Sequence, residues 1–299
     1  MGRDEGVNLE FVGKFIGWLL YTIWLGFYNT FVPYSWKTKK RLTSKKVLIT
    51  GGASGIGAAC AKLLVEEGCQ VAIWDIHEEN LANIHRELEK TGYTIYTQKV
   101  DLSNESEILK ACDDLKERFG DVDILFNNAG LGNASSFLQS NTETMKYIFD
   151  VNIFAHMHIV RQLLPRMIEK GEGHIVATSS FGGICALGEF VDYSTTKFAV
   201  RGFMEALNNQ LELQGVSGIE FTTVFPGYVR TPIWKEFNPG KQYIPVIDAD
   251  EMAEEIVRGI KLNQKEVIYP KRLTWIMIAK AILPLNVQRS LLLHKFCWS

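Results

Sequence analysis

The chain has 299 residues, of which 46% are hydrophobic and 22% are charged, and its formal net charge is −2. This size and composition are typical of a globular protein with a full core, and the near-neutral charge gives no electrostatic case for binding nucleic acid. The five cysteines, at positions 60, 69, 112, 185 and 297, form no CxxC pair and no Cys/His metal spacing. We therefore expect no metal site, and reduced thiols in a cytosol-facing protein.

Residues 1–44 predict a hydrophobic membrane anchor followed by a basic linker. No charged residue stands between Phe15 and Trp36, and as a helix this segment would be about 33 Å long, which is enough for a bilayer core. Its many aromatic residues leave open whether it spans the membrane or lies in the membrane plane. A helix buried against the domain is a third possibility. The basic run after Trp36 favours a cytosolic position for the following domain.

Residues 45–270 alternate short apolar runs with amphipathic stretches, without an internal repeat or a linker. The pattern predicts strands over 46–50, 70–75, 94–100, 122–130 with its turn, 173–180, 219–227 and 266–270. It predicts helices over 56–67, 78–90, 142–170, 192–214 and 249–262. Such alternation indicates a single α/β domain with a doubly wound parallel sheet of about seven strands, covered on both faces.

Residues 271–299 form a further apolar segment, which Lys280 and Pro284 interrupt. We expect a helix here. It either contacts the membrane, covers a substrate pocket or packs on the surface of the domain.

The first predicted strand runs into a glycine-rich loop, "TGGASGIG" at 50–57, and a predicted helix follows directly. Glycines let backbone amides approach a pyrophosphate, and the helix N-terminus favours its negative charge. Asp75 ends the second predicted strand, where a carboxylate binds both ribose hydroxyls of NAD and repels the 2′-phosphate of NADP. No Lys or Arg stands in the loop to receive that phosphate, so we expect NAD. The alternative for Asp75 is an N-cap of the next helix.

The stretch "YSTTK" places Tyr193 and Lys197 four residues apart, on one face of a predicted helix. A nearby cation favours the phenolate. Lowering the pKa of a phenol from about 10 to about 7 takes roughly 4 kcal/mol, of which one cation in a partly dry site supplies much. The pair is therefore a candidate acid/base, although the same spacing is common on helices without any catalytic role.

These motifs, with "DL" at 101–102, "NNAG" at 127–130 and Ser180, resemble the short-chain dehydrogenase/reductase family, which has a Rossmann-like fold. The hydrophobic ends resemble its membrane-associated branch, which includes retinol dehydrogenases and 17β-hydroxysteroid dehydrogenases. The resemblance implies that Tyr193 is the acid/base, that Lys197 sets it and holds the nicotinamide ribose, and that Ser180 binds the substrate oxygen. Ser179 is the alternative serine. Asn152 matches an asparagine that holds a proton-relay water.

The resemblance also implies a set of cofactor contacts and substrate contacts. The family often has alanine where Gly52 stands, and we expect glycine to loosen the turn slightly. Substrate contacts are expected at Ser180, Tyr193, Trp234 and Phe237. In addition to Tyr193 and Lys197, NAD contacts are expected at Gly51, Ser54, Gly55, Ile56, Gly57, Asp75, Asp101, Leu102, Asn128, Ala129, Gly130, Pro226, Gly227, Val229 and Thr231.

The resulting hypothesis is a membrane-bound oxidoreductase that transfers hydride between NAD and a lipophilic alcohol, such as a retinoid, a steroid or another lipid. We expect it at the endoplasmic reticulum membrane or a lipid droplet surface, as a homodimer with its catalytic domain facing the cytosol. Two alternatives stay open. One is an NADPH-dependent carbonyl reductase of lipid substrates, and the other is a non-catalytic lipid-surface scaffold.

Overall fold

The computed structural model describes residues 13, 14, 16, 17, 20, 21 and 24, and the ranges 32–90, 92–93, 95–133, 137–234 and 245–288. The chain divides into two compact units, Met1–Lys40 and Arg41–Ser299. The second unit contains the whole predicted α/β domain.

In the smaller unit, the described residues between 13 and 24 are helical, and Tyr34–Trp36 form a short 3-10 helix, η1. Ile16, Leu20 and Trp24 follow one another at a spacing of four, which places them on one helix face, and all three are exposed. Among the residues that the structure describes, no helix combines the length and the apolar character needed to cross a bilayer.

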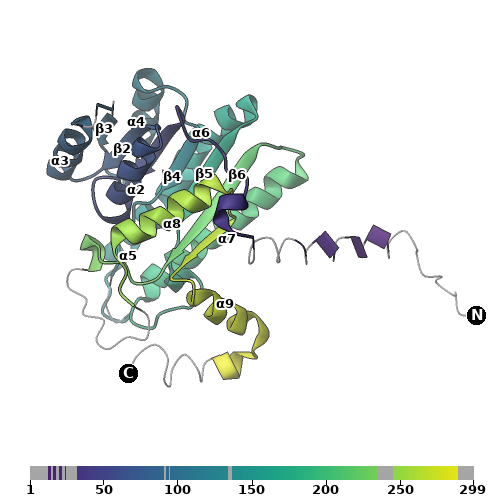
Figure 1. The fold of residues 1–299 in the computed structure, drawn as a ribbon. Helices are drawn as coiled ribbons and strands as arrows, with labels where there is room; N and C mark the ends of the chain where they lie inside the picture. The colour runs from purple at the N-terminus through teal and green to yellow at the C-terminus, as the bar shows by residue number, and fades with distance from the viewer. Residues whose placement is uncertain are drawn as a thin grey trace, which may run out of the picture. The chain divides into compact units, whose positions relative to one another are not determined.

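The described part of the larger unit contains seven strands in one parallel sheet (Figure 1), with the order β3-β2-β1-β4-β5-β6-β7. Chain order reverses between β1 and β4, the position at which doubly wound sheets bind ligands. The predicted Rossmann-like α/β domain is thus confirmed. The strands are β1 (Lys46–Thr50), β2 (Gln70–Asp75), β3 (Ile95–Lys99), β4 (Ile124–Asn127), β5 (Gly173–Thr178), β6 (Ile219–Pro226) and β7 (Glu266–Tyr269).

Helices cover both faces of the sheet because each buried strand presents apolar side chains alternately to either side. Val47 and Ile49 belong to the core under α2, α3 and α8, whereas Leu48 belongs to the core under α4, α6 and α7. Figure 1 shows α2 and α8 side by side in front of the sheet. The bounds of these helices are α2 (Gly55–Glu66), α3 (Glu78–Glu89), α4 (Glu105–Arg118), α6 (Ala155–Lys170), α7 (Val191–Leu213) and α8 (Ala249–Lys261).

A third apolar cluster lies beneath the C-terminal helix α9 (Leu273–Ile282) and includes Phe181 and Ile184, which follow β5. The Lys280 Nζ atom donates a hydrogen bond to the carbonyl oxygen of Ile184 and lies 5.0 Å from the ring centroid of Phe198. This contact ties α9 to the segment that begins at Ser180.

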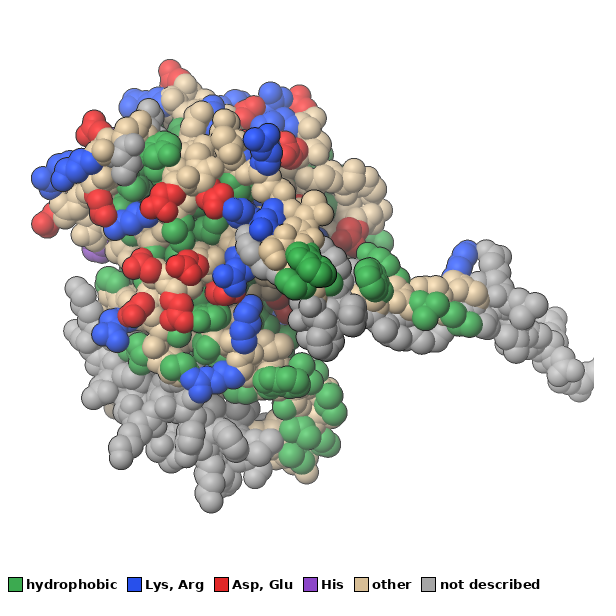
Figure 2. All heavy atoms as spheres, viewed as in Figure 1, with side chains coloured by type: hydrophobic (Ala, Val, Ile, Leu, Met, Phe, Trp, Pro, Cys, Tyr) green, Lys and Arg blue, Asp and Glu red, His purple; other side chains and the backbone are tan. Residues whose placement is uncertain are grey.

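The outer face of α9 is apolar and exposed. Trp275 and Ile282 are 73% and 74% exposed, and Ile278 between them is also exposed. Figure 2 shows hydrophobic side chains gathered over α9. The helix is ten residues long, and it presents one apolar face to the domain and another to the outside.

Two features of the larger unit were not predicted. Helix α4 is absent from the predicted elements, although Asn104 caps it and its buried side chains recur at helical spacing. The predicted helix 142–170 is interrupted: α5 (Thr142–Phe149) and α6 are joined by a turn of π-helix, η2 (Asp150–Phe154). π-turns of this kind occur often at functional sites.

Candidate active site

A pocket of about 780 Å³ lies at the carboxyl ends of the strands, where the order of the sheet reverses. Parallel strands bring their carboxyl ends to one edge, so residues from distant parts of the chain meet there. The predicted residues that line the pocket are Gly51, Ser54, Gly55, Ile56, Asp75, Asp101, Leu102, Asn128, Ala129, Gly130, Ser180, Tyr193, Lys197, Pro226, Gly227, Val229 and Thr231.

The glycine loop presents the N-terminus of α2 to this pocket. Ser54 precedes the helix in an extended conformation and makes no side-chain cap, so the first backbone N–H groups have no partner from that side chain. Asn128 donates from its side chain to the carbonyl oxygens of Thr50 and Gly51, both at 3.1 Å, which ties the loop to the end of β4. An open helix N-terminus on a braced loop suits a pyrophosphate.

Gly57 is the one predicted cofactor contact in the loop that does not line the pocket. A Cβ atom there would lie 2.2 Å from the carbonyl oxygen of Gly51, so Gly57 lets the helix pack closely against the loop. Gly52 is closely packed as well. A Cβ atom at Gly52 would lie 2.8 Å from Cγ2 of the buried Ile73. Close packing therefore favours glycine at this position, and the expectation that it loosens the turn slightly stays a prediction.

Asp75 lies at the far end of the pocket and is 6% exposed. Its carboxylate accepts hydrogen bonds from the backbone N–H groups of Ala53, at 3.1 Å, and of His77, at 3.0 Å. His77 is the N-cap of α3, so Asp75 is not the cap of that helix. Each carboxylate oxygen keeps a free acceptor position. The cradle therefore fits a ribose with two hydroxyl groups.

The surroundings of Asp75 are acidic. Glu78 and Glu79 line the pocket beside it, and Lys197 is the only Lys or Arg among the described residues that line the pocket. The Lys99 Nζ atom, on the adjacent strand, lies 3.6 Å from the Glu78 carboxylate. A 2′-phosphate would therefore meet negative charge at this end.

Ser180, Tyr193 and Lys197 meet at the opposite end of the pocket. The Ser180 side chain hydrogen-bonds the Tyr193 phenol and accepts from the backbone N–H of Gly182 at 3.0 Å. The Lys197 Nζ atom donates to the carbonyl oxygen of Thr178 at 2.9 Å. Ser179 instead donates from its hydroxyl to the carbonyl oxygen of Lys197 at 2.7 Å. Ser180, rather than Ser179, is thus the serine that contacts the phenol.

The protonation of this group differs from the sequence expectation. Burial raises the pKa of Tyr193 to about 12, and the hydrogen bond with Ser180 opposes this only in part. Burial also lowers the pKa of Lys197 to about 8. The Lys197 Nζ atom lies 5.6 Å from the centroid of the Tyr193 ring. The chain alone does not bring the phenol towards a pKa of 7, because dehydration of the phenolate outweighs the hydrogen bond with Ser180.

Asn152 lies behind the pocket, in the π-turn η2, and is fully buried. Its side chain accepts from the backbone N–H of Leu131 at 2.7 Å and donates to the carbonyl oxygen of Leu131 at 2.9 Å. It also donates to the Thr196 hydroxyl at 3.0 Å. Asn152 therefore braces the turn after β4 against α7, next to Lys197.

The substrate end of the site is described in part. The backbone of Trp234 ends the short helix η4 (Pro232–Trp234), its side chain is not among the described ones, and Phe237 lies outside the described residues. The sequence reasoning missed several lining residues, most of which directly follow a strand or neighbour a predicted residue. They are Ile76, His77, Glu78, Glu79, Asn80, Val100, Leu131, Tyr147, Val151, Thr178 and Pro232.

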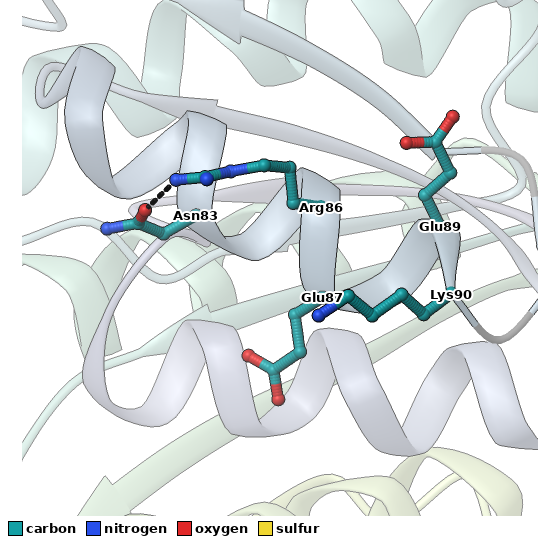
Figure 3. Close-up of a pocket in the computed structure, with 5 residues that line it drawn as sticks. All are labelled: Asn83, Arg86, Glu87, Glu89 and Lys90. Carbon is teal, nitrogen blue, oxygen red and sulfur yellow. Dashed lines mark hydrogen bonds between the residues drawn. The ribbon is translucent and has the colours of Figure 1, made fainter.

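A second hollow lies along α3 (Figure 3). It is lined by Asn83, Arg86, Glu87, Glu89 and Lys90, all from one helix and its last turn. Arg86 donates to the Asn83 side chain at 2.7 Å. Its residues match no predicted motif.

Residues 45–242 match the family model of the short chain dehydrogenases. The chain belongs to the short-chain dehydrogenase family. It is 30% identical over 276 residues to rat 17-beta-hydroxysteroid dehydrogenase 13, covering 92% of this chain and 90% of the relative. It is 33% identical over 253 residues to human epidermal retinol dehydrogenase 2, covering 84% of this chain and 82% of the relative. The resemblance to this branch is confirmed.

Solved structures show the same fold. A short-chain dehydrogenase/reductase from Burkholderia phymatum in complex with NAD superposes with a TM-score of 0.75 at 23% identity, covering 81% of this chain and 94% of the other. A short-chain dehydrogenase from Sphingobium yanoikuyae in complex with NADPH superposes with a TM-score of 0.70 at 25% identity, covering 79% and 93%. This short-chain dehydrogenase is therefore an oxidoreductase of a family that uses nicotinamide cofactors, related to steroid and retinol dehydrogenases.

Proposed function

We propose that this chain is an NAD-dependent dehydrogenase of a lipophilic alcohol that works at a membrane or lipid droplet surface. The observation that carries the proposal is a single pocket with an acidic ribose cradle at one end and the Ser180, Tyr193 and Lys197 group at the other. In this proposal residues 45–270 are the catalytic domain. Residues 1–44 and 271–299 attach it to the endoplasmic reticulum membrane or to a droplet, and the domain works as a homodimer.

The preference for NAD rests on charge. Asp75 offers two acceptor oxygens to vicinal hydroxyls, and Glu78 and Glu79 beside it disfavour a phosphate. The uncapped start of α2 at Ser54 is suited to the pyrophosphate that joins the two halves of the dinucleotide.

The chemistry of the chain's own residues is proton transfer. A bound nicotinamide cofactor supplies the hydride acceptor. Tyr193 in its ionised form removes the hydroxyl proton of the alcohol, and Ser180 hydrogen-bonds the oxygen as it becomes a carbonyl. Lys197 holds a positive charge beside the phenol and orients it. Positioned proton transfer of this kind contributes about 10²–10⁴-fold to a rate.

Two observations support a lipophilic substrate. Leu131, Val151 and Ile233 give the catalytic end of the pocket an apolar lining, and the relatives are named for steroid and retinol chemistry. The exposed apolar face of α9, with Trp275 and Ile282, suits a lipid surface. An enzyme held at such a surface receives its substrate from the lipid phase.

One observation favours a second candidate, reduction of a lipid carbonyl with NADPH. The raised pKa of Tyr193 means that the phenol is protonated at neutral pH in the chain alone, and a protonated phenol is the donor that reduction needs. The acidic surroundings of Asp75 argue against NADPH, so we rank this candidate second.

The proposal is tested by nicotinamide reduction with detergent-held protein. NAD and NADP are offered with retinol, hydroxysteroids and long-chain alcohols, beside a Tyr193→Phe control. We expect NAD reduction with one lipid class, and a loss of at least about 10²-fold in the control. The control should bind NAD like the wild type. Equal turnover by Tyr193→Phe, or reduction of NADP alone, would contradict the proposal.

A further inference from the structure

Lys280 is a charged residue on the face of α9 that packs against the domain. Leu273, Ile276 and Met277 on this face join the apolar cluster beneath the helix. Lys280 follows them at helical spacing, so it lies on the same face and is half-buried. The described lining of the active-site pocket does not include Lys280, so any effect that it has on the reaction passes through another residue.

The ammonium of Lys280 contacts two elements of the domain. Its Nζ atom donates to the carbonyl oxygen of Ile184 and lies 5.0 Å from the ring centroid of Phe198 on α7, within the range of a cation–π contact. Ile184 is 1% exposed, and a buried carbonyl that is left without a donor costs free energy. Lys280 supplies a donor, and it thereby ties α9 both to the segment after β5 and to α7.

Ile184 ends a short turn that begins at Ser180. The turn is the 3-10 helix η3 (Phe181–Gly183), with Ser180 as its N-cap and Ile184 as its C-cap. The backbone N–H of Ile184 donates to the carbonyl oxygen of Phe181 at 2.9 Å, and that of Gly182 donates to the Ser180 hydroxyl at 3.0 Å. Because these bonds lie within one turn, a shift of the Ile184 carbonyl is transmitted to the Ser180 side chain.

The same turn lies against the candidate catalytic residues of α7. A Cβ atom at Gly182 would lie 3.4 Å from Cε1 of Tyr193 and 3.5 Å from the Ser180 hydroxyl oxygen. A Cβ atom at Gly183 would lie 2.7 Å from the carbonyl oxygen of Lys197. The turn is therefore closely packed against α7, and a small displacement of it changes how Ser180 meets the Tyr193 phenol.

We propose that Lys280 is a positioning residue for Ser180. Its ammonium holds the turn η3 against α7 and so keeps the Ser180 hydroxyl where it contacts the Tyr193 phenol and the substrate oxygen. The consequence for catalysis rests on the function proposed above for Ser180 and Tyr193. The tie between α9 and the turn does not depend on that function. Helix α9 thus has a role at the active site in addition to the lipid contact proposed for its outer face.

A matched set of variants tests the catalytic consequence. Lys280→Met keeps an apolar stem and removes the ammonium, whereas Lys280→Arg keeps a cation with its donors. The control is Lys261→Met, since Lys261 is also half-buried but pairs with Glu67 at 2.7 Å instead. We expect Lys280→Met to lower kcat about tenfold through misplacement of the Ser180 hydroxyl. KM for NAD should stay unchanged, because the ribose cradle lies at the other end of the pocket.

Lys280→Arg should recover most of the rate, and Lys261→Met should turn over like the wild type. A double variant shows whether the effect passes through Ser180. If Lys280 acts on that hydroxyl, Lys280→Met should cause no further loss of kcat in the Ser180→Ala protein. A full additional loss in that background, or a wild-type kcat in Lys280→Met alone, would overturn the positioning role. Each kcat is expressed per NAD-binding site, so that loss of folded protein is not counted as loss of rate.

Hydrogen exchange gives a readout without turnover and separates this inference from the proposed function. The backbone amides of residues 181–185, followed by mass spectrometry, should exchange at least about tenfold faster in Lys280→Met than in the wild type. Lys280→Arg should restore the slow exchange, and the amides of α8 should be unaffected. If the turn exchanges faster but no alcohol is oxidised by any of the proteins, the proposed function fails and the tie stands. Unchanged exchange of the turn in Lys280→Met overturns the inference.

Discussion

Replacing Asp75 with asparagine should change which dinucleotide this short-chain dehydrogenase prefers. The carboxylate is nearly buried and accepts from the backbone N–H groups of Ala53 and His77. Asparagine has almost the same shape and keeps one acceptor oxygen, but it carries no charge. The fold should persist, because one of the two backbone hydrogen bonds remains and none of the apolar core is altered.

The size of the effect follows from the lost charge. At about 5 Å and an effective dielectric constant of about 20, one carboxylate repels each phosphate charge by roughly 3 kcal/mol, and screening at the open end of the pocket reduces this. A hydrogen bond from a ribose hydroxyl to a charged acceptor contributes about 1.5–3 kcal/mol. Together these terms predict that the NAD-to-NADP affinity ratio falls by roughly 10²-fold in Asp75→Asn.

Calorimetric titration with NAD and NADP measures this ratio without any alcohol substrate. The control is Asp101→Asn, in the same pocket, because the Asp101 carboxylate is engaged by the N–H and hydroxyl of Ser103 at 2.9 and 2.7 Å. It should leave the ratio unchanged. An unchanged ratio in Asp75→Asn, or a wild-type preference for NADP, would refute the reasoning.

Three further predictions concern the site and α9. Folding lowers the pKa of Lys197 from 10.5 to about 8. Between pH 8 and 10.5 the unfolded chain therefore binds more protons than the folded chain. The free energy of unfolding should therefore rise by up to roughly 3 kcal/mol from pH 8 to 10.5. In Lys197→Met the free energy of unfolding, measured by denaturation at each pH, should rise less over this range. The same dependence on pH in the variant and the wild type would contradict the prediction. Gly52→Ala places a methyl group against Ile73 and should lower the free energy of unfolding, measured in urea, by about 1–3 kcal/mol. An unchanged denaturation midpoint would show that the loop shifts to make room for the methyl group. The double variant Trp275→Glu, Ile282→Glu should bind lipid vesicles at least about tenfold more weakly in a flotation assay. Its melting temperature should not fall, because both side chains are exposed. Undiminished flotation would show that α9 does not contact the membrane.

Much of the fold was accessible from local pattern. The runs at 46–50 and 70–75 became β1 and β2 with the predicted bounds, because β-branched and apolar runs of that length are stable only as buried strands. Helix α4 carried an equally local signal in Asn104 and its apolar spacing, so that omission was avoidable. The π-turn at 150–154 was not predictable, since it depends on the bonds between Asn152 and Leu131.

In the candidate site, too, some features depend on tertiary packing and not on local sequence. Ser180 and Ser179 are adjacent hydroxyls, and only the packing of β5 against α7 directs the first to Tyr193 and the second to the Lys197 carbonyl. The acidic neighbours Glu78 and Glu79 were missed because their relevance depends on how α3 follows the end of β2 at the pocket.

The sequence by itself determined the parallel α/β sheet and the family and predicted the catalytic group, because these follow from local periodicity and from short motifs. The tertiary structure decided the burial of that group: burial raises the pKa of Tyr193, for which the sequence predicted a lowering, and it lowers the pKa of Lys197. It also placed Gly52 where a Cβ atom would lie 2.8 Å from Cγ2 of Ile73. Dehydration and close contact arise between residues far apart in the chain, and no local pattern encodes them.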